Sequence, residues 1–184
     1  MEHIHEENYG AGIIRIYHDD YAEAPDWHFS KKICFHNKYR LGDKHDYDHQ
    51  DYSGWNEMEK DIIKEEKPHT ILPLYLYDHS GITISTTPFS CGWDSGQVGF
   101  ILMSKKTIKE NRLNKERITE MLLEEVEEYD KYLRGEVYQY RIFQLNKEGV
   151  MESVEIAGGI YGFEECLKEA KEFIDMIEKA EEVK

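Results

Sequence analysis

The sequence is poor in cysteine. Cys34, Cys91 and Cys166 are the three cysteines among 184 residues, and no two of them form a CxxC pair. An odd number of widely spaced cysteines argues against a disulfide framework and against a cysteine-based zinc site. This usage is typical of proteins in a reducing compartment, so the sequence predicts a cytoplasmic protein.

Long hydrophobic runs and positive charge are also lacking. No apolar stretch approaches the roughly 20 residues that a membrane-spanning helix needs. The segment Met1–Glu7 has neither the cationic start nor the apolar core of a secretory signal, so we expect no membrane association. The chain has 38 acidic and 23 basic residues and a net charge of −15. Because nucleic-acid affinity depends on cationic contacts with phosphate, we expect no direct nucleic-acid binding.

The usual nucleotide-cradling loops are absent, since neither GxxxxGK[ST] nor GxGxxG occurs. The sequence contains no internal repeat and no linker rich in proline, glycine or serine. Hydrophobic residues make up 40% of the chain and aromatic residues 12%, which is typical of a globular protein. We therefore expect one domain that spans residues 1–184.

Hydrophobic periodicity predicts the elements of this domain. Alternating or continuous apolar residues predict strands over 12–17, 32–35, 71–77, 82–87, 97–104, 136–145 and 150–156. Apolar residues at helical spacing predict helices over 54–67, 116–133 and 163–183. Short turns such as Asp78–Gly81 link neighbouring strands as hairpins. The predicted fold class is α+β, a mainly antiparallel sheet of hairpins packed with about three amphipathic helices.

Two central motifs are distinctive: LYLYDHSGIT at Leu74–Thr83 and FSCGWDSGQVGFI at Phe89–Ile101. Together with Cys34–Asp43 and Tyr129–Tyr138, they resemble a small protein family that occurs in bacteriophage and prophage genomes and has no established activity. The resemblance implies a phage-type accessory protein. The family has an Asp-Asn pair after the tryptophan near position 27, where this chain has His28-Phe29.

The two motifs carry four candidate catalytic residues: His79, Cys91, Asp94 and Ser95. An intervening strand of roughly 8 residues would separate the two loops by about 25 Å. A nucleophile and its base must lie within ~3 Å of each other, so His79 and Cys91 form a dyad only if the chain folds back. The alternative interpretation is an ordinary turn in which Asp94 accepts backbone hydrogen bonds.

A second group contains candidate metal ligands: His36, Asp43, His45 and His49. His45 and His49 are four residues apart and would share one face of a helix. Imidazole ligands favour zinc or manganese over calcium. The alternative is a solvated acidic loop, because the segment is rich in Asp and Tyr.

The helix predicted over 116–133 is strongly acidic. Its candidate partner-binding residues are Glu120, Glu124, Glu127 and Glu128. Carboxylates spaced along a helix can imitate the phosphates of a duplex and attract a protein that handles nucleic acid. The alternative is a solvated helix face.

Two functions follow from these observations. The first is an acidic accessory protein that binds and modulates a host protein, one that handles nucleic acid or serves in defence. Acidic helices and aromatic strand residues would form its contact surface; the aromatic residues are Tyr75, Tyr77, Phe100, Tyr138 and Tyr140. The alternative is a small hydrolase that uses loops 36–49, 78–80 and 91–95. The first function needs no cofactor, and the second allows a divalent metal ion.

Overall fold

The chain folds into two compact units in a computed structural model that describes residues 2–182. Unit 1 combines the chain up to Ala24 with the chain from Arg134 onward, and unit 2 is Pro25–Leu133. Each unit has a sheet of four strands among the described residues, and every strand pair is antiparallel. The predicted α+β class, with antiparallel pairing and amphipathic helices, is confirmed. The expectation of one domain over residues 1–184 stays a prediction.

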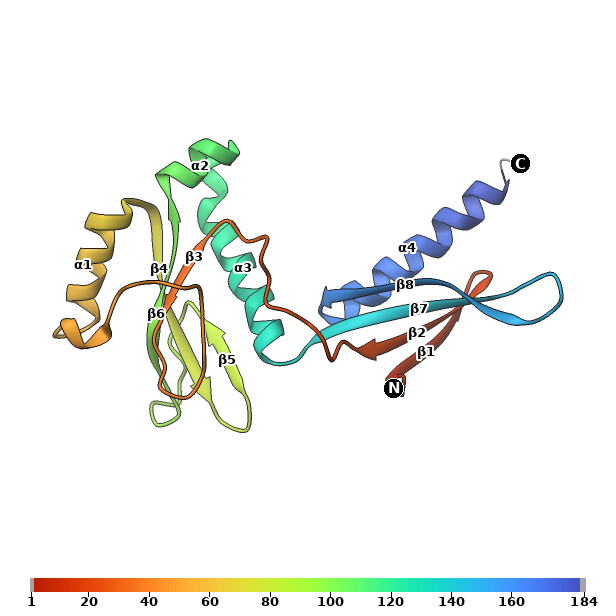
Figure 1. The fold of residues 1–184 in the computed structure, drawn as a ribbon, viewed down its shortest axis with the longest axis horizontal. Helices are drawn as coiled ribbons and strands as arrows, with labels where there is room; N and C mark the ends of the chain where they lie inside the picture. Colours follow the sequence, from red (N-terminus) through yellow and green to blue (C-terminus); the bar gives the residue numbers. More distant parts are fainter. Residues whose placement is uncertain (1, 183–184) are drawn as a thin grey trace. The chain divides into compact units, whose positions relative to one another are not determined.

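The sheet of unit 1 has the strand order β1-β2-β7-β8. Its strands are β1 (His5–Tyr9), β2 (Gly12–His18), β7 (Val137–Leu145) and β8 (Met151–Tyr161). Helix α4 (Phe163–Glu182) covers one face of this sheet (Figure 1).

The core of unit 1 arises from two periodicities. Every second residue of β2 and β7 faces α4, and Ile14, Ile16 and Ile142 are fully buried there. Ala170 and Ile174 are four apart on α4 and meet this face. Tyr138 and Tyr140 lie in the same core at 8% and 5% exposure, so the prediction that they form a contact surface is wrong.

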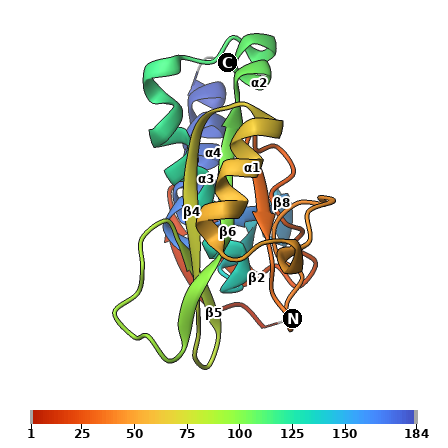
Figure 2. The same cartoon turned by 90° about the vertical axis from the view of Figure 1, so that its left-hand side faces the viewer.

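The sheet of unit 2 has the strand order β3-β6-β4-β5. Its strands are β3 (Lys31–Cys34), β4 (Pro68–Asp78), β5 (Ile82–Ser85) and β6 (Ser95–Ser104). Its α-helices are α1 (Trp55–Glu66), α2 (Lys105–Asn111) and α3 (Ile118–Leu133), with single 3-10 turns η1 (His49–Asp51) and η2 (Lys115–Arg117). Helices α1 and α3 cover opposite faces of the sheet (Figures 1 and 2).

Each face of this sheet has its own hydrophobic core. On the α1 side, Met58 and Ile62 pack against Phe100 and Leu102. Phe100 is only 2% exposed, so it cannot belong to the predicted contact surface. On the α3 side, Leu122 packs with residues of β4, β5 and β6. The alternating strand β6 therefore supplies both cores.

Two polar anchors fix unit 2 beyond these cores. The Asp130 carboxylate of α3 accepts hydrogen bonds from the Thr83 hydroxyl at 2.5 Å and from the Ile84 N–H at 2.7 Å, which fastens β5 to the helix. Gly99 of β6 lies so close to β3 that an added Cβ would be 1.9 Å from the Ile33 carbonyl oxygen. Only glycine fits at this position.

None of the helices in residues 2–182 combines the length and the apolar composition that crossing a bilayer requires.

Candidate functional site

A large open cleft lies at one edge of the unit 2 sheet. Its volume is about 1340 Å³. Leu41 and Leu76 reach it from the α3 side of the sheet, while Phe35 and Trp55 reach it from the α1 side. Because side chains from both faces of the sheet line the cleft, the cleft lies at the edge of the sheet rather than over either face.

The cleft exists because β3 ends before β6 does. The two strands pair up to Cys34 and Gly99, and one further hydrogen bond runs from the Phe35 N–H to the Val98 carbonyl at 2.7 Å. The chain then turns away into the loop that begins at His36. Strand β6 continues to Ser95 and pairs with β4 on its other side. Among the described residues, Ser95–Val98 therefore has no strand beside it at the cleft.

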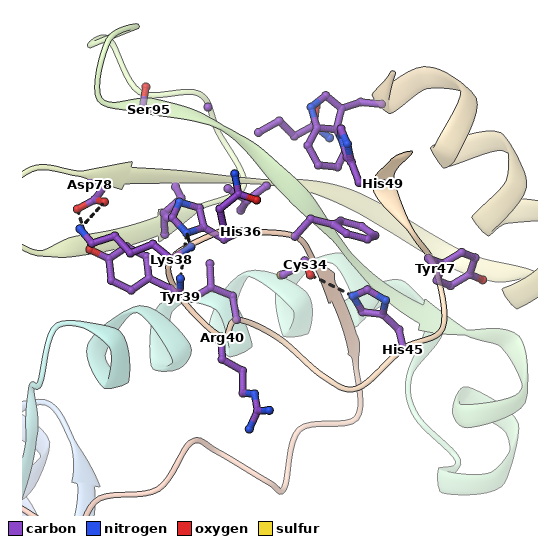
Figure 3. A pocket seen from close by; sticks show the side chains of 18 of the residues that line it. Cys34, His36, Lys38, Tyr39, Arg40, His45, Tyr47, His49, Asp78 and Ser95 are labelled. Atoms are coloured by element: carbon purple, nitrogen blue, oxygen red, sulfur yellow. Dashed lines mark hydrogen bonds and ion pairs between the residues drawn. The ribbon is translucent and has the colours of Figure 1, made fainter. Parts of the chain in front are cut away.

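The first wall of the cleft is the loop from His36 to Leu41. The His36 Nδ1 accepts hydrogen bonds from the N–H groups of Lys38 and Tyr39, at 3.2 and 3.1 Å, and its ring stacks on Tyr39. The Tyr39 hydroxyl and the Lys38 ammonium in turn donate to the Asp78 carboxylate at the end of β4, at 3.0 and 3.3 Å (Figure 3). These contacts hold the loop against the end of the sheet.

The Asp78 carboxylate holds this loop through its contacts with Lys38 and Tyr39, here called the Asp78 anchor. Partial desolvation raises the pKa of its carboxyl group, but the hydrogen bonds from Tyr39 and Lys38 outweigh that effect and the net pKa is lowered. The pKa of Lys38 is raised by its contacts with Tyr39 and Asp78. The anchor therefore stays charged at neutral pH.

The second wall is a row of aromatic rings, here called the aromatic wall: Phe35, His45, His49 and Trp55. Ring centroids are 4.8 Å apart for Phe35 and His45, and 4.7 Å apart for His49 and Trp55. Trp55 rests edge-on against the buried Phe100, which anchors the row to the core. The wall thus presents a continuous aromatic surface to the cleft.

His45 has a defined tautomer. Its Nε2 lies 3.0 Å from the Cys34 carbonyl, which can only accept a hydrogen bond, so Nε2 carries the proton. The buried Nδ1 has no hydrogen-bond partner in the described structure.

The structure brings the four candidate catalytic residues together. The His79 Nδ1 lies 3.1 Å from the Asp94 Oδ2, and the Cys91 Sγ lies 3.9 Å from the same oxygen. The Ser95 hydroxyl donates to the Cys91 carbonyl. The separation of about 25 Å expected from a fully extended link is wrong. Strand β5 is short, and the chain returns so that Ser95 pairs with Tyr77.

The order of these groups does not match a nucleophilic triad. In a triad the imidazole lies between the nucleophile and the carboxylate, so that it can take the nucleophile's proton. Here the Asp94 carboxylate lies between Cys91 and His79. The His79 and Asp94 side chains are 63% and 41% exposed, so bulk water surrounds the pair.

The candidate metal ligands have other partners or lie apart. Asp43 Oδ2 accepts a hydrogen bond from the Lys32 N–H at 2.6 Å, while His36 and His45 are engaged as described above. His49 packs on Trp55. Within residues 2–182, no three His, Cys, Asp or Glu side chains form a group that could hold a metal ion.

The four candidate partner-binding residues of α3 each have a partner. Glu120 and Glu124 pair with Arg117 at 2.8 and 3.8 Å. Glu127 pairs with Lys131 at 3.1 Å. The Glu128 Oε2 accepts hydrogen bonds from the Trp27 indole and from the His28 Nε2, at 3.2 and 2.8 Å. The partners partly neutralise the negative charges of these four glutamates, which therefore differ from the unpaired phosphates of a duplex.

Sequence reasoning missed Trp93. This side chain lines the cleft and is 98% exposed. A tryptophan that leaves its indole in water makes no contribution to the core that would explain its presence. The sequence offered a signal, because Trp93 lies in the turn Gly92–Asp94 that precedes β6.

Comparison of the chain with protein-family models, with curated proteins and with solved structures gives no match.

Proposed function

We propose that this chain is a protein-binding module and that the cleft of unit 2 is its contact site. In keeping with the resemblance to phage proteins, the proposed partner is a host protein that handles nucleic acid or serves in defence. Binding there would modulate the partner's activity.

The observation that carries this proposal is the exposure of Trp93 at the rim of a large open cleft. Tryptophan is enriched among the few interface residues that supply most of the binding energy. The net charge of −15 favours a basic partner through long-range attraction. The proposed contact therefore moves from α3, whose carboxylates are paired, to the cleft.

Affinity capture with a matched pair of variants tests the proposal. The immobilised chain is incubated with a lysate of the bacterial host, and the captured proteins are identified by mass spectrometry. Trp93→Ala should lower capture of the specific partner by at least about tenfold, as expected for a central interface residue. Tyr21→Ala is the control, because Tyr21 is 86% exposed but belongs to unit 1. Equal loss in both variants, or in neither, would contradict the proposal.

The hydrolase alternative rests on one observation, the convergence of His79, Cys91 and Asp94. Hydrolysis of p-nitrophenyl acetate by the chain and by its Cys91→Ser variant tests it. A Cys91-dependent burst of nitrophenol would support a nucleophilic thiol. Equal rates for the two proteins would remove this alternative, and the carboxylate between thiol and imidazole predicts that result.

A further inference from the structure

We infer that the cleft binds an extended segment of the partner, which adds a strand to β6 and places an arginine side chain on the aromatic wall. This inference rests on the proposed function and specifies the chemistry of the partner. Two features carry it: the open edge of β6 and the composition of the cleft walls.

The open edge supplies the backbone part of the site. Ser95, Gly96 and Gln97 pair with β4 on one side and border the cleft on the other. Three residues of strand span roughly 10 Å, which is enough for a short peptide to pair with. A Cβ added to Gly96 would meet nothing within 4 Å, so the sheet face over this part of the strand is also uncovered. An edge bordered by a cleft can accept an added strand, because its outward backbone groups need partners.

A register shift marks the same place. Leu74 pairs with Gly99 and Tyr75 with Gln97, so Val98 is an extra residue in β6. Bulges of this kind re-aim the chain and often lie beside functional sites. The Val98 carbonyl holds Phe35, the first ring of the aromatic wall, through the Phe35 N–H. The open edge and the wall are thus fixed to each other by one hydrogen bond.

The charged and aromatic residues that line the cleft favour a cationic side chain in the bound segment. Asp46, Asp48, Asp78 and Asp94 line the cleft, and the cationic residues there are Lys38 and Arg40. Lys38 is already paired with Asp78, and Figure 3 shows Arg40 pointing away from the other labelled side chains. Asp46 and Asp48 are exposed and line the same cleft as His45 and His49 of the aromatic wall. A cation in the cleft would be attracted by the carboxylates and by the rings.

Arginine fits this combination better than lysine. Its guanidinium group is planar and stacks on aromatic faces, and its five N–H donors can serve a carboxylate at the same time. An anionic or acceptor-only group would meet the excess of carboxylates and is disfavoured.

Four synthetic peptides test the inference by nuclear magnetic resonance. The probe is acetyl-Thr-Val-Arg-Val-Thr-amide. The second peptide has Glu in place of Arg, and the third has Pro in place of both Val residues, which removes backbone donors. The fourth has Lys in place of Arg. The backbone amide signal of Gly96 reports strand addition, and the indole signal of Trp55 reports stacking. The indole of Trp27, outside the cleft lining, is the internal reference.

The probe should shift the Gly96 and Trp55 signals together and leave Trp27 unchanged. The Glu peptide should bind at least about tenfold more weakly, as the loss of a cation–π contact predicts. The Pro peptide should leave Gly96 unshifted. Equal affinity of the Arg and Glu peptides, or of an otherwise identical Lys peptide, would overturn the arginine assignment. A bound probe without a Gly96 shift would overturn strand addition.

Charge variants of the chain separate this inference from the proposed function. Asp46→Asn should weaken the probe by about threefold or more, whereas Asp20→Asn, an exposed site in unit 1 with the same charge change, should not. If the probe does not bind and Trp93→Ala still lowers capture of the partner, this inference fails and the proposed function stands. If the probe binds while capture does not depend on Trp93, the proposed function fails instead.

Discussion

The buried ammonium of Lys32 lies 3.0 Å from the Nδ1 of His28. The His28 Nε2 lies 2.8 Å from the Glu128 carboxylate, so Nε2 carries the proton and Nδ1 is free to accept from Lys32. The His28 side chain is 4% exposed and Lys32 is 3% exposed. This relay joins the segment before β3 to α3.

Removing the middle of the relay should destabilise unit 2. His28→Ala leaves the Lys32 ammonium with one acceptor fewer in a buried site, and it leaves a cavity. We expect the free energy of unfolding to fall by about 2–4 kcal/mol, as for a broken buried polar pair. Urea denaturation measures the change. His36→Ala, which removes an imidazole bonded only to nearby N–H groups, should cost clearly less.

The burial of Lys32 also predicts that the free energy of unfolding depends on pH. Burial lowers the pKa of Lys32, although the carboxylates of Asp43 and Glu125 act in the opposite direction. The unfolded chain therefore holds this proton more tightly than the folded chain does. The cost of burying the ammonium is fully present below the folded-state pKa, and it is relieved as pH rises through that pKa toward the ordinary lysine pKa of about 10.4.

The measurement compares the protein with Lys32→Met between pH 7 and pH 10. The free energy of unfolding of the unmodified protein should rise relative to that of the variant over the upper part of this range. Lys44→Met is the control, because Lys44 is exposed. A constant difference between protein and variant across the range would refute the prediction.

Replacement by alanine should affect stability very differently at two glycines of β6. Gly99→Ala drives a Cβ to 1.9 Å from the Ile33 carbonyl oxygen, so β3 must separate from β6. We expect a loss of at least about 2 kcal/mol of unfolding free energy, or no folded protein. Gly96→Ala meets nothing within 4 Å and should change stability by less than about 1 kcal/mol. Thermal denaturation of both variants tests this prediction. Similar melting temperatures would contradict the close approach of β3 and β6.

The three cysteines should differ in reactivity. Cys34 and Cys166 are buried, and burial raises the pKa of each thiol to about 12. Cys91 is partly exposed in the loop before β6. A thiol reagent such as dithiobis-nitrobenzoate should therefore label one thiol per folded chain and three after denaturation. Labelling of the folded Cys91→Ser variant would show that a second thiol is accessible.

The sequence predicted the elements that have strong hydrophobic periodicity. Strand β2 and helix α3 lie within a few residues of their predicted bounds. Strand β1 was missed because HEENY is almost wholly polar; it forms through pairing with β2 at the sheet edge. Helix α2 is seven residues long, too short for a clear period. The Ser104 hydroxyl accepts a hydrogen bond from the Thr107 N–H and caps the start of this helix.

The division into two sheets could not be predicted, because it depends on pairing between distant segments. Strand β2 pairs with β7, which follows the whole of unit 2 in the chain. The meeting of His79 with Asp94 has the same cause: local spacing predicts an extended link between the two loops, but the chain folds back. The aromatic wall joins Phe35 to Trp55 across a long loop, and no local spacing reveals that contact.

The pairing of β2 with β7 also sets an order for synthesis on the ribosome. Every residue of unit 2 leaves the ribosome before β7 does, so unit 2 can complete its cores while the β1–β2 hairpin is still waiting for its neighbour. An isolated two-stranded hairpin is at best marginally stable in water. Unit 1 therefore folds last, although its first two strands precede unit 2 in the chain, because its sheet is completed only when β7 and β8 have emerged.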